Sequence, residues 1–198
     1  PLAKRASLEI GMIYYNQGNN DEAIDAYKQV VARYPNSVET KTALESMEQI
    51  YVERNDVGAY FDYTRSIGSQ VVVTNASRED SLTYLAAERL YMKGDTTNAI
   101  KALEDYSRKF CNDSKSQNCI NSKFYLADCY FSNGRDDDAY RIYDELSNMY
   151  GNQHMETVLA RKAQIAYDKQ DYESSLEAFK RLEKEAQEPE NITAAKLG

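Results

Sequence analysis

The sequence predicts an all-α protein, a right-handed α–α superhelix built from five stacked helix–turn–helix units. Three observations support this prediction. A turn residue recurs at steps of 37, 39, 40 and 36 residues, and small residues stand at fixed distances on either side of it. Nine positions after the turn residue stand Tyr27, Thr64, Leu103, Tyr143 and Phe179. The turn residues are Gly18, Asn55, Gly94, Gly134 and Gln170. We number each repeat from its turn residue, so that position −7 lies seven residues before it and position +5 five residues after it.

Small residues in this register indicate where the two helices of a repeat meet, because backbones approach closely only where side chains are small. Position −7 is held by Gly11, Glu48, Ala87, Ala127 and Ala163. Position +5 is held by Ala23, Tyr60, Ala99, Ala139 and Ser175. We expect Ala127 and Ala139 to face each other at such a crossing. The larger residues at position +9 are expected to fill the space towards the next repeat.

The first repeat has the clearest boundaries. Its turn, Gly18–Asp21, ends one helix with glycine and supplies capping residues for the next, and Pro35 cannot continue a helix. The second repeat departs from the pattern at positions −7 and +5, so its assignment depends on spacing and on the apolar series Leu44, Met47, Ile50 and Tyr51. We predict a single solenoid over residues 1–198, with repeats at about 4–37, 38–76, 77–111, 120–151 and 156–187 and a partial repeat at 191–198.

The extra length of the repeats falls in two connections, residues 68–75 and 111–121. Within the first, the β-branched run Val71–Val73 is expected to be extended. Residues 191–198 resemble the opening of a further first helix, with Asn191 as its N-cap. This pattern favours a fragment of a longer repeat array.

The first repeat resembles the tetratricopeptide (TPR) repeat, and the residues that carry the resemblance are Gly11, Tyr14, Gly18, Ala23, Tyr27 and Pro35. This family implies a non-catalytic scaffold for protein–protein interaction and needs no cofactor. Long repeats with tyrosine-rich helices and a Tyr-Pro-Asn-Ser ending (34–37) look like TPR proteins of the Gram-negative cell envelope. The resemblance therefore implies a periplasmic or outer-membrane-associated protein with a role in envelope assembly.

Composition argues against several classes of function. The chain has 24 basic and 32 acidic residues and a net charge of −8, without the clusters of Lys and Arg that bind nucleic acid. No apolar stretch reaches the length of a membrane-spanning helix. The one histidine, His154, is expected in a solvated loop, and no phosphate-binding loop or activated nucleophile is recognisable. Residues 136–138, three aspartates, open a helix, where carboxylates act as caps more often than as calcium ligands.

The three cysteines have different expected roles. Cys129 lies between core positions and is expected to be a small buried residue. Cys111 and Cys119 flank a polar loop and would pair in an oxidising compartment, although two free surface thiols are the alternative. Their spacing does not match a zinc site.

Position −3 of each first helix supplies the candidate partner-binding residues. In the TPR arrangement this position faces the inner groove, and four of its five occupants are aromatic: Tyr15, Tyr91, Phe131 and Tyr167. Aromatic side chains commonly anchor bound peptides. Ordinary packing between neighbouring first helices is the alternative explanation for them.

The flanking positions −10 and −6 limit the chemistry of the partner. None of the five repeats places a basic residue there, whereas acidic residues do occur, for example Glu88 and Asp128. An acidic peptide would meet unpaired carboxylates, so we expect a neutral or basic protein or peptide. Binding of a small ligand or glycan segment in the aromatic groove is the alternative function.

Overall fold

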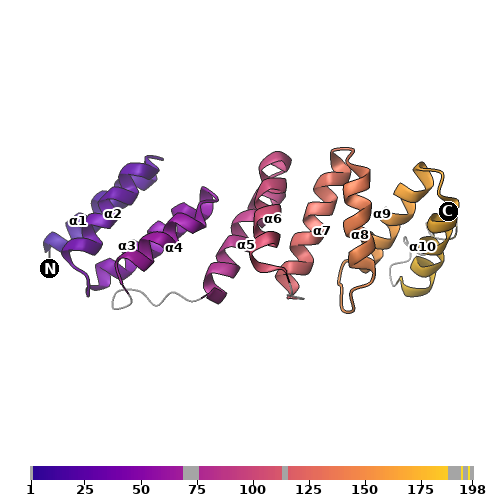
Figure 1. The fold of residues 1–198 in the computed structure, drawn as a ribbon. Coiled ribbons are helices and arrows are strands. Elements are labelled where there is room, and N and C mark those ends of the chain that lie inside the picture. Colours follow the sequence, from indigo (N-terminus) through magenta and orange to yellow (C-terminus); the bar gives the residue numbers. More distant parts are fainter. Residues whose placement is uncertain (1, 69–75, 113–115, 187–192, 194–195, 197–198) are drawn as a thin grey trace. The chain divides into compact units, whose positions relative to one another are not determined.

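The structure, a computed structural model, describes residues 2–68, 76–112, 116–186, 193 and 196. These residues form ten α-helices and no strand (Figure 1). The predicted all-α fold of consecutive helix pairs is thereby confirmed. The helices are α1 (Leu2–Asn16), α2 (Asn20–Arg33), α3 (Val38–Glu53), α4 (Val57–Ser66), α5 (Ala76–Met92), α6 (Thr96–Phe110), α7 (Gln117–Ser132), α8 (Asp136–Ser147), α9 (Met155–Asp168) and α10 (Tyr172–Glu185).

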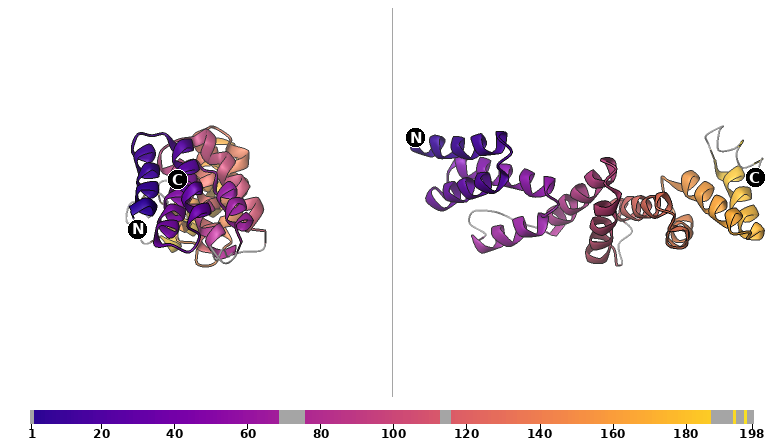
Figure 2. Two further views of the ribbon diagram at one scale, coloured as in Figure 1. Left: turned by 90° about the vertical axis from the view of Figure 1, so that its left-hand side faces the viewer. Right: turned by 90° about the horizontal axis from the view of Figure 1, so that it is seen from above.

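The chain divides into two compact units, residues 1–86 and 87–198, and the boundary falls within α5. In the first unit α1 packs on α2, α2 on α3 and α3 on α4, and α1 also contacts α3, its counterpart in the next repeat. In the second unit α6 to α10 pack in the same consecutive manner, and the hairpins can be followed in Figure 2. One continuous solenoid with the repeat boundaries given above stays a prediction.

All five turn residues adopt the left-handed backbone conformation. Their φ angles are +78° at Gly18, +54° at Asn55, +73° at Gly94, +68° at Gly134 and +62° at Gln170. In every repeat the turn residue's N–H donates to the carbonyl at position −3 and the next N–H donates to the carbonyl at −4, at 2.8–3.1 Å. This pair of bonds is the Schellman motif, which satisfies the last carbonyls of a helix. The register defined by spacing therefore corresponds to one repeated backbone structure.

Positions −7 and +5 are buried in the repeats that carry small residues there. Ala127 and Ala139 are both fully buried, on the packed pair α7 and α8. In the fifth repeat the Ser175 hydroxyl donates to the Ala163 carbonyl at 3.0 Å, which brings the second helix directly onto the backbone of the first. Serine is tolerated at this helix crossing because the Ala163 carbonyl accepts a hydrogen bond from its hydroxyl.

Leucine at Ala127 or Ala139 is expected to lower the free energy of unfolding by about 1–3 kcal/mol, because added methylenes overpack a filled contact. The control is Ala32→Leu on the exposed surface of α2, which should have little effect. Urea unfolding followed by circular dichroism measures both. If Ala127→Leu is as stable as Ala32→Leu, the crossing is not where the register places it.

The second repeat replaces the small pair with a chain of polar groups. Tyr60, at position +5, is buried, and its hydroxyl is hydrogen-bonded to Glu48 at position −7. Arg78 at the start of α5 binds the same carboxylate through two bonds, Nη2–Oε1 at 2.7 Å and Nε–Oε2 at 2.9 Å. The two residues that break the sequence pattern therefore satisfy each other, and a bidentate arginine balances the carboxylate's charge.

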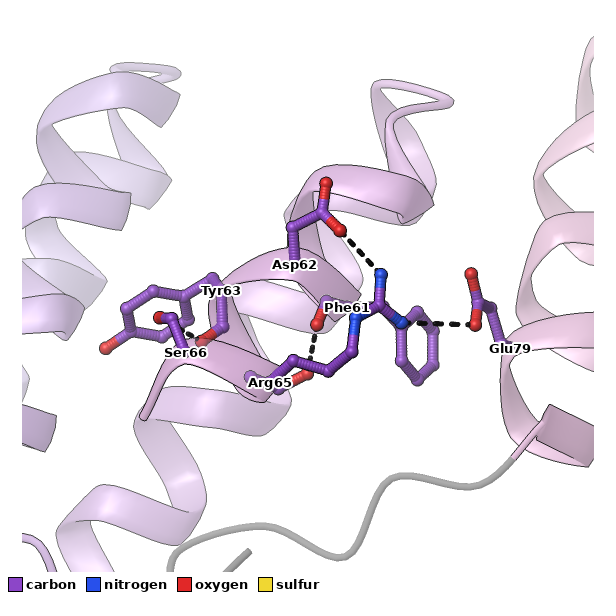
Figure 3. Close-up of polar contacts among 7 residues, drawn as sticks. Phe61, Asp62, Tyr63, Arg65, Ser66 and Glu79 are labelled. Carbon is purple, nitrogen blue, oxygen red and sulfur yellow. Dashed lines mark hydrogen bonds and ion pairs between the residues drawn. The ribbon is translucent and has the colours of Figure 1, made fainter. Parts of the chain in front are cut away.

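A second arginine links α4 to α5 across the connection between them. Arg65 points between two carboxylates, with Nη2 at 2.5 Å from Asp62 and Nη1 at 3.5 Å from Glu79 (Figure 3). Asp62 lies on the same helix and Glu79 on the first turns of α5, where the Glu79 side chain is mostly buried. Together with the bonds between Arg78 and Glu48, this contact holds the beginning of α5 against α3 and α4.

Two sequence predictions fall where little is described. The expected extended run Val71–Val73 lies outside the described residues. Of the further helix expected at 191–198, only Thr193 and Lys196 are described, and both are helical.

Candidate partner-binding face

The four aromatic residues at position −3 remain accessible to different degrees. Tyr15, Tyr91 and Phe131 are half-buried, and 53% of Tyr167 is exposed. Tyr15 belongs to the first unit and the other three to the second. That these four residues line one continuous groove stays a prediction, so each residue is described in its own surroundings.

Tyr15 lies on α1 and reaches across to α3. Its hydroxyl donates to the Glu53 carboxylate, at 3.2 Å to Oε1, and accepts a bond from Gln49 Nε2 at 2.9 Å. Gln49 and Glu53 also bind each other at 3.2 Å. The half-buried ring is therefore held by a polar network on the next first helix.

Tyr91 on α5 makes the equivalent contact with α7. Its ring stacks on Tyr125, with centroids 4.4 Å apart, and its hydroxyl donates to Asp128 Oδ2 at 3.0 Å. Burial, followed by the bond to Asp128 and that residue's charge, raises the pKa of the Tyr91 hydroxyl. Tyr125 in turn donates to Glu88 Oε1 at 3.3 Å. Two tyrosine–carboxylate bonds thus join α5 to α7.

Phe131 has no hydroxyl, and Tyr167 makes no hydrogen bond to a carboxylate among the contacts that the structure describes. Arg161 of α9 places its guanidinium 4.5 Å from the ring centroid of Phe131. Tyr167 packs edge-on against Tyr172 at the start of α10, with centroids 5.6 Å apart. Tyr15, Tyr91 and Phe131 therefore share one arrangement, in which each contacts the next first helix. Packing between repeats accounts for part of their burial, and the exposed remainder is available to a partner.

A cavity of about 350 Å³ opens beside Tyr91 in the second unit. It is lined by Tyr91, Met92, Gly94, Thr96, Asp128, Cys129 and Ser132. Met92 is largely exposed at this site, whereas the Cys129 thiol is buried, and burial together with the Asp128 charge raises its pKa to about 11. The thiol is therefore protonated at neutral pH and is not an activated nucleophile. The combination of apolar walls and one carboxylate suits an apolar or basic side chain.

The sequence analysis found the aromatic residues but missed several of the groups that hold them. Tyr125 and Arg161 both occupy position −9, and Arg161 is a basic group beside Phe131 that the flanking positions −10 and −6 do not reveal. Position −9 is held by Glu9, Ser46, Leu85, Tyr125 and Arg161, so no shared residue type marks the last two as contacts. The predicted absence of basic residues therefore holds for positions −10 and −6 alone.

His154 is not the solvated loop residue that was expected. Its ring is half-buried and stacks on Phe124 with centroids 4.0 Å apart, and Nε2 lies 3.0 Å from Asn121 Oδ1. Burial lowers the pKa of the imidazole below its usual value. The histidine thus packs the connection before α9 onto α7.

The structure joins Cys111 and Cys119 by a disulfide and buries Cys129 as a free thiol. The three aspartates at 136–138 form the first turn of α8, where Asp137 pairs with Lys169 and Asp138 with Arg135. Across the described part of the chain, no group of three or more potential metal-binding side chains comes together. None of the described helices is long and apolar enough to cross a membrane.

Comparison with known proteins connects this fold to a family. The tetratricopeptide repeat model matches residues 5–37 and 122–152, which correspond to the first and fourth predicted repeats. No curated protein matches the sequence significantly.

Three similar solved structures show how far the likeness extends. YrrB, described as a TPR protein with an unusual peptide-binding site, has 13% identity and a TM-score of 0.50, over 97% of this chain and 91% of its own. The apo form of RapI has 13% identity and a TM-score of 0.51, over 96% of this chain and 56% of its own. PilF of Pseudomonas aeruginosa has 16% identity and a TM-score of 0.48, over 98% and 84%. At these identities the likeness to YrrB and RapI shows the fold alone. The two family matches identify residues 5–37 and 122–152 as tetratricopeptide repeats, and the repeated helix pairs show the fold of this family over the described chain.

Proposed function

We propose that this protein is a non-catalytic scaffold that binds a protein or peptide partner through the first-helix face of its second unit, as part of cell-envelope assembly. The observation that carries the proposal is the cavity beside Tyr91 and Asp128, which combines accessible apolar surface with a carboxylate. Its volume of about 350 Å³ suits one or two side chains of a peptide. The TPR fold itself is one that serves protein–protein interaction, and YrrB has a peptide-binding site.

Charge on this face favours a neutral or basic partner. Glu88 and Asp128 each accept a hydrogen bond from a tyrosine hydroxyl, and these bonds orient the two carboxylates. Lysine or arginine in the partner would complement them, and glutamate or aspartate would be repelled. Arg161 beside Phe131 offsets part of this charge and leaves room for neutral peptides.

A peptide array tests the proposal, with one aromatic anchor flanked by lysine, glutamine or glutamate. We expect the protein to bind the lysine and glutamine series and to discriminate against the glutamate series. Met92→Ala and Phe131→Ala should each weaken binding about tenfold or more, as for anchors at other interfaces. The matched control is Tyr150→Ala, since Tyr150 is a fully exposed aromatic residue in the connection between α8 and α9.

Two results would contradict the proposal. One is preferential binding of the glutamate peptides. The other is an equal loss of affinity in Tyr150→Ala and Phe131→Ala. Retention of oligosaccharides on a glycan array, with no peptide bound, would instead support the alternative of a small-ligand or glycan-binding module at the same cavity.

The envelope location draws its support from the disulfide between Cys111 and Cys119, because such bonds persist in oxidising compartments. Protein isolated from its native cells and denatured in a thiol-blocking reagent should react at one cysteine, Cys129. Reduction should then expose two more thiols. Mass spectrometry counts the labels, and three labels before reduction would argue for a reducing compartment. Closing this short loop should contribute about 2–3 kcal/mol to stability on the chain-entropy model.

A further inference from the structure

Asp128 on α7 is a half-buried carboxylate that forms no ion pair with any described residue. It accepts one hydrogen bond, from the Tyr91 hydroxyl to Oδ2 at 3.0 Å. Arg161, the basic residue found beside this face, lies on a neighbouring ring and does not pair with Asp128 in the described chain. By contrast, the mostly buried carboxylates Glu48 and Glu79 of the first unit are each bound by an arginine. A carboxylate removed from water in this way is stabilised by a bound cation, which Asp128 does not find on its neighbours.

The negative charge of Asp128 acts on the groups that surround it. Burial is the main cause of the raised pKa values of Tyr91, Cys129 and Tyr143, and the Asp128 charge is a further cause at each of them. All three groups are therefore neutral at pH 7, and none of them balances the carboxylate. A positive group from outside the chain would do so.

The cavity of about 350 Å³ beside Asp128 has room for a long side chain that carries such a group. One part of its lining is apolar, since it includes the Tyr91 ring and the Met92 side chain, which is 65% exposed. The hydroxyls of Thr96 and Ser132 also line it. A lysine side chain combines a methylene stem that packs on apolar surface with an ammonium group that donates three hydrogen bonds.

We propose that this cavity receives a lysine side chain of the partner, with its methylene groups against Tyr91 and Met92 and its ammonium group bound by Asp128. The assignment rests on the proposed function, because it names the residue of the bound peptide that enters the site. Arginine suits the cavity less well. A guanidinium binds a carboxylate best through two parallel bonds, and one Asp128 oxygen already accepts the Tyr91 hydroxyl. A compact ammonium group needs only the other oxygen and can donate to the nearby hydroxyls.

Four versions of one peptide test the assignment. The starting peptide is the tightest-binding lysine member of the array described above, trimmed to a single lysine, which is then replaced by norleucine, Nε-acetyl-lysine or arginine. Norleucine keeps the methylene stem without the ammonium group, and acetylation removes the charge. We expect both to bind about tenfold more weakly than lysine, and arginine to bind several-fold more weakly. Fluorescence anisotropy measures the four dissociation constants.

Asp128→Asn tests where the ammonium group binds. Asparagine keeps the size of the side chain and can still accept the Tyr91 hydroxyl, but it has no charge, so the lysine and norleucine peptides should bind this variant equally. The matched control is Asp105→Asn, which makes the same change in net charge at an exposed position of α6 that does not line the cavity. It should preserve the tenfold difference. Circular dichroism establishes that both variants are folded, and the comparison of the four peptides requires only the parent protein.

The possible results separate this assignment from the proposed function. If norleucine or arginine binds as tightly as lysine, the lysine assignment is wrong, although peptide binding stands. A preference for lysine that Asp128→Asn preserves would also overturn it, because the ammonium group would then bind elsewhere. If no peptide of the array binds at all, the proposed function fails and the assignment fails with it.

Discussion

Replacing Gly11 with alanine is expected to lower the free energy of unfolding by about 1–3 kcal/mol, although alanine is the better helix former. A Cβ atom at Gly11 would lie 2.4 Å from Cε1 and 2.6 Å from Cδ1 of Tyr27. The Tyr27 ring is fully buried in the core of the first unit and is enclosed by its neighbours. The added methyl group must therefore separate α1 from α2 or displace the ring.

Gly58 provides the matched control in the same unit. It lies in the first turn of α4, and a Cβ atom there would meet no heavy atom within 4 Å. Gly58→Ala should raise the free energy of unfolding by about 0.4–1 kcal/mol, because alanine restricts the unfolded chain. Urea unfolding of the two variants compares an identical chemical change with and without the contact. Equal and stabilising effects would show that the α1–α2 crossing is looser than the structure has it.

The backbone of this fold could be predicted from the sequence because the determining interactions are local. A left-handed residue ends each first helix, and its position follows from spacing even where the residue is Asn55 or Gln170 instead of glycine. Local spacing does not predict the side-chain contacts of the second repeat. Its large residues at −7 and +5 looked like a loss of pattern, yet Arg78, 30 residues after Glu48, completes their hydrogen bonding. Periodicity within a repeat gives no sign of a partner in the next one.

Part of the candidate face could also be predicted from the spacing within each repeat. A shared offset places Tyr91 and Phe131 on equivalent sides of their helices, and this can be read without a structure. Which side chain reaches across from the neighbouring helix depends on the distance and angle between helices, so Tyr125 and Arg161 were missed. His154 was misjudged because a connection can fold back onto a helix, and no sequence period describes that packing.

The protein is expected to lose stability steeply above about pH 10, the pH at which tyrosines of the unfolded chain ionise. Burial raises the pKa of several buried tyrosines, among them Tyr60, Tyr130 and Tyr143, and for Tyr130 the value is about 12. Above pH 10 the unfolded chain has therefore lost protons that the folded chain still holds. The free energy of unfolding falls by about 1.4 kcal/mol per pH unit for each such group, and the fall ends once the folded group ionises.

Tyr143 isolates one of these contributions. It is fully buried, and within the described residues its hydroxyl has no hydrogen-bond partner, while the nearby Asp128 charge adds to the rise of its pKa. Tyr143→Phe removes a buried polar atom whose desolvation is uncompensated, so at pH 8 the variant should be as stable as the parent or more stable. Above about pH 10 its stability should fall less steeply than the parent's, by about 1.4 kcal/mol per pH unit.

Two further phenylalanine substitutions control this measurement. Tyr150 is fully exposed, so Tyr150→Phe should leave the alkaline slope unchanged. Tyr27 occupies the same register position as Tyr143 and is equally buried, but its hydroxyl is hydrogen-bonded to Ser46. Tyr27→Phe should therefore lower the free energy of unfolding by about 1 kcal/mol at pH 8, whereas Tyr143→Phe should not lower it. Urea unfolding at pH 8, 10 and 11 supplies all of these values. If Tyr143→Phe is destabilised at pH 8, the Tyr143 hydroxyl has a hydrogen-bond partner, such as a bound water. The tyrosine hydroxyls at position +9 would then be hydrogen-bonded in both the first and the fourth repeat.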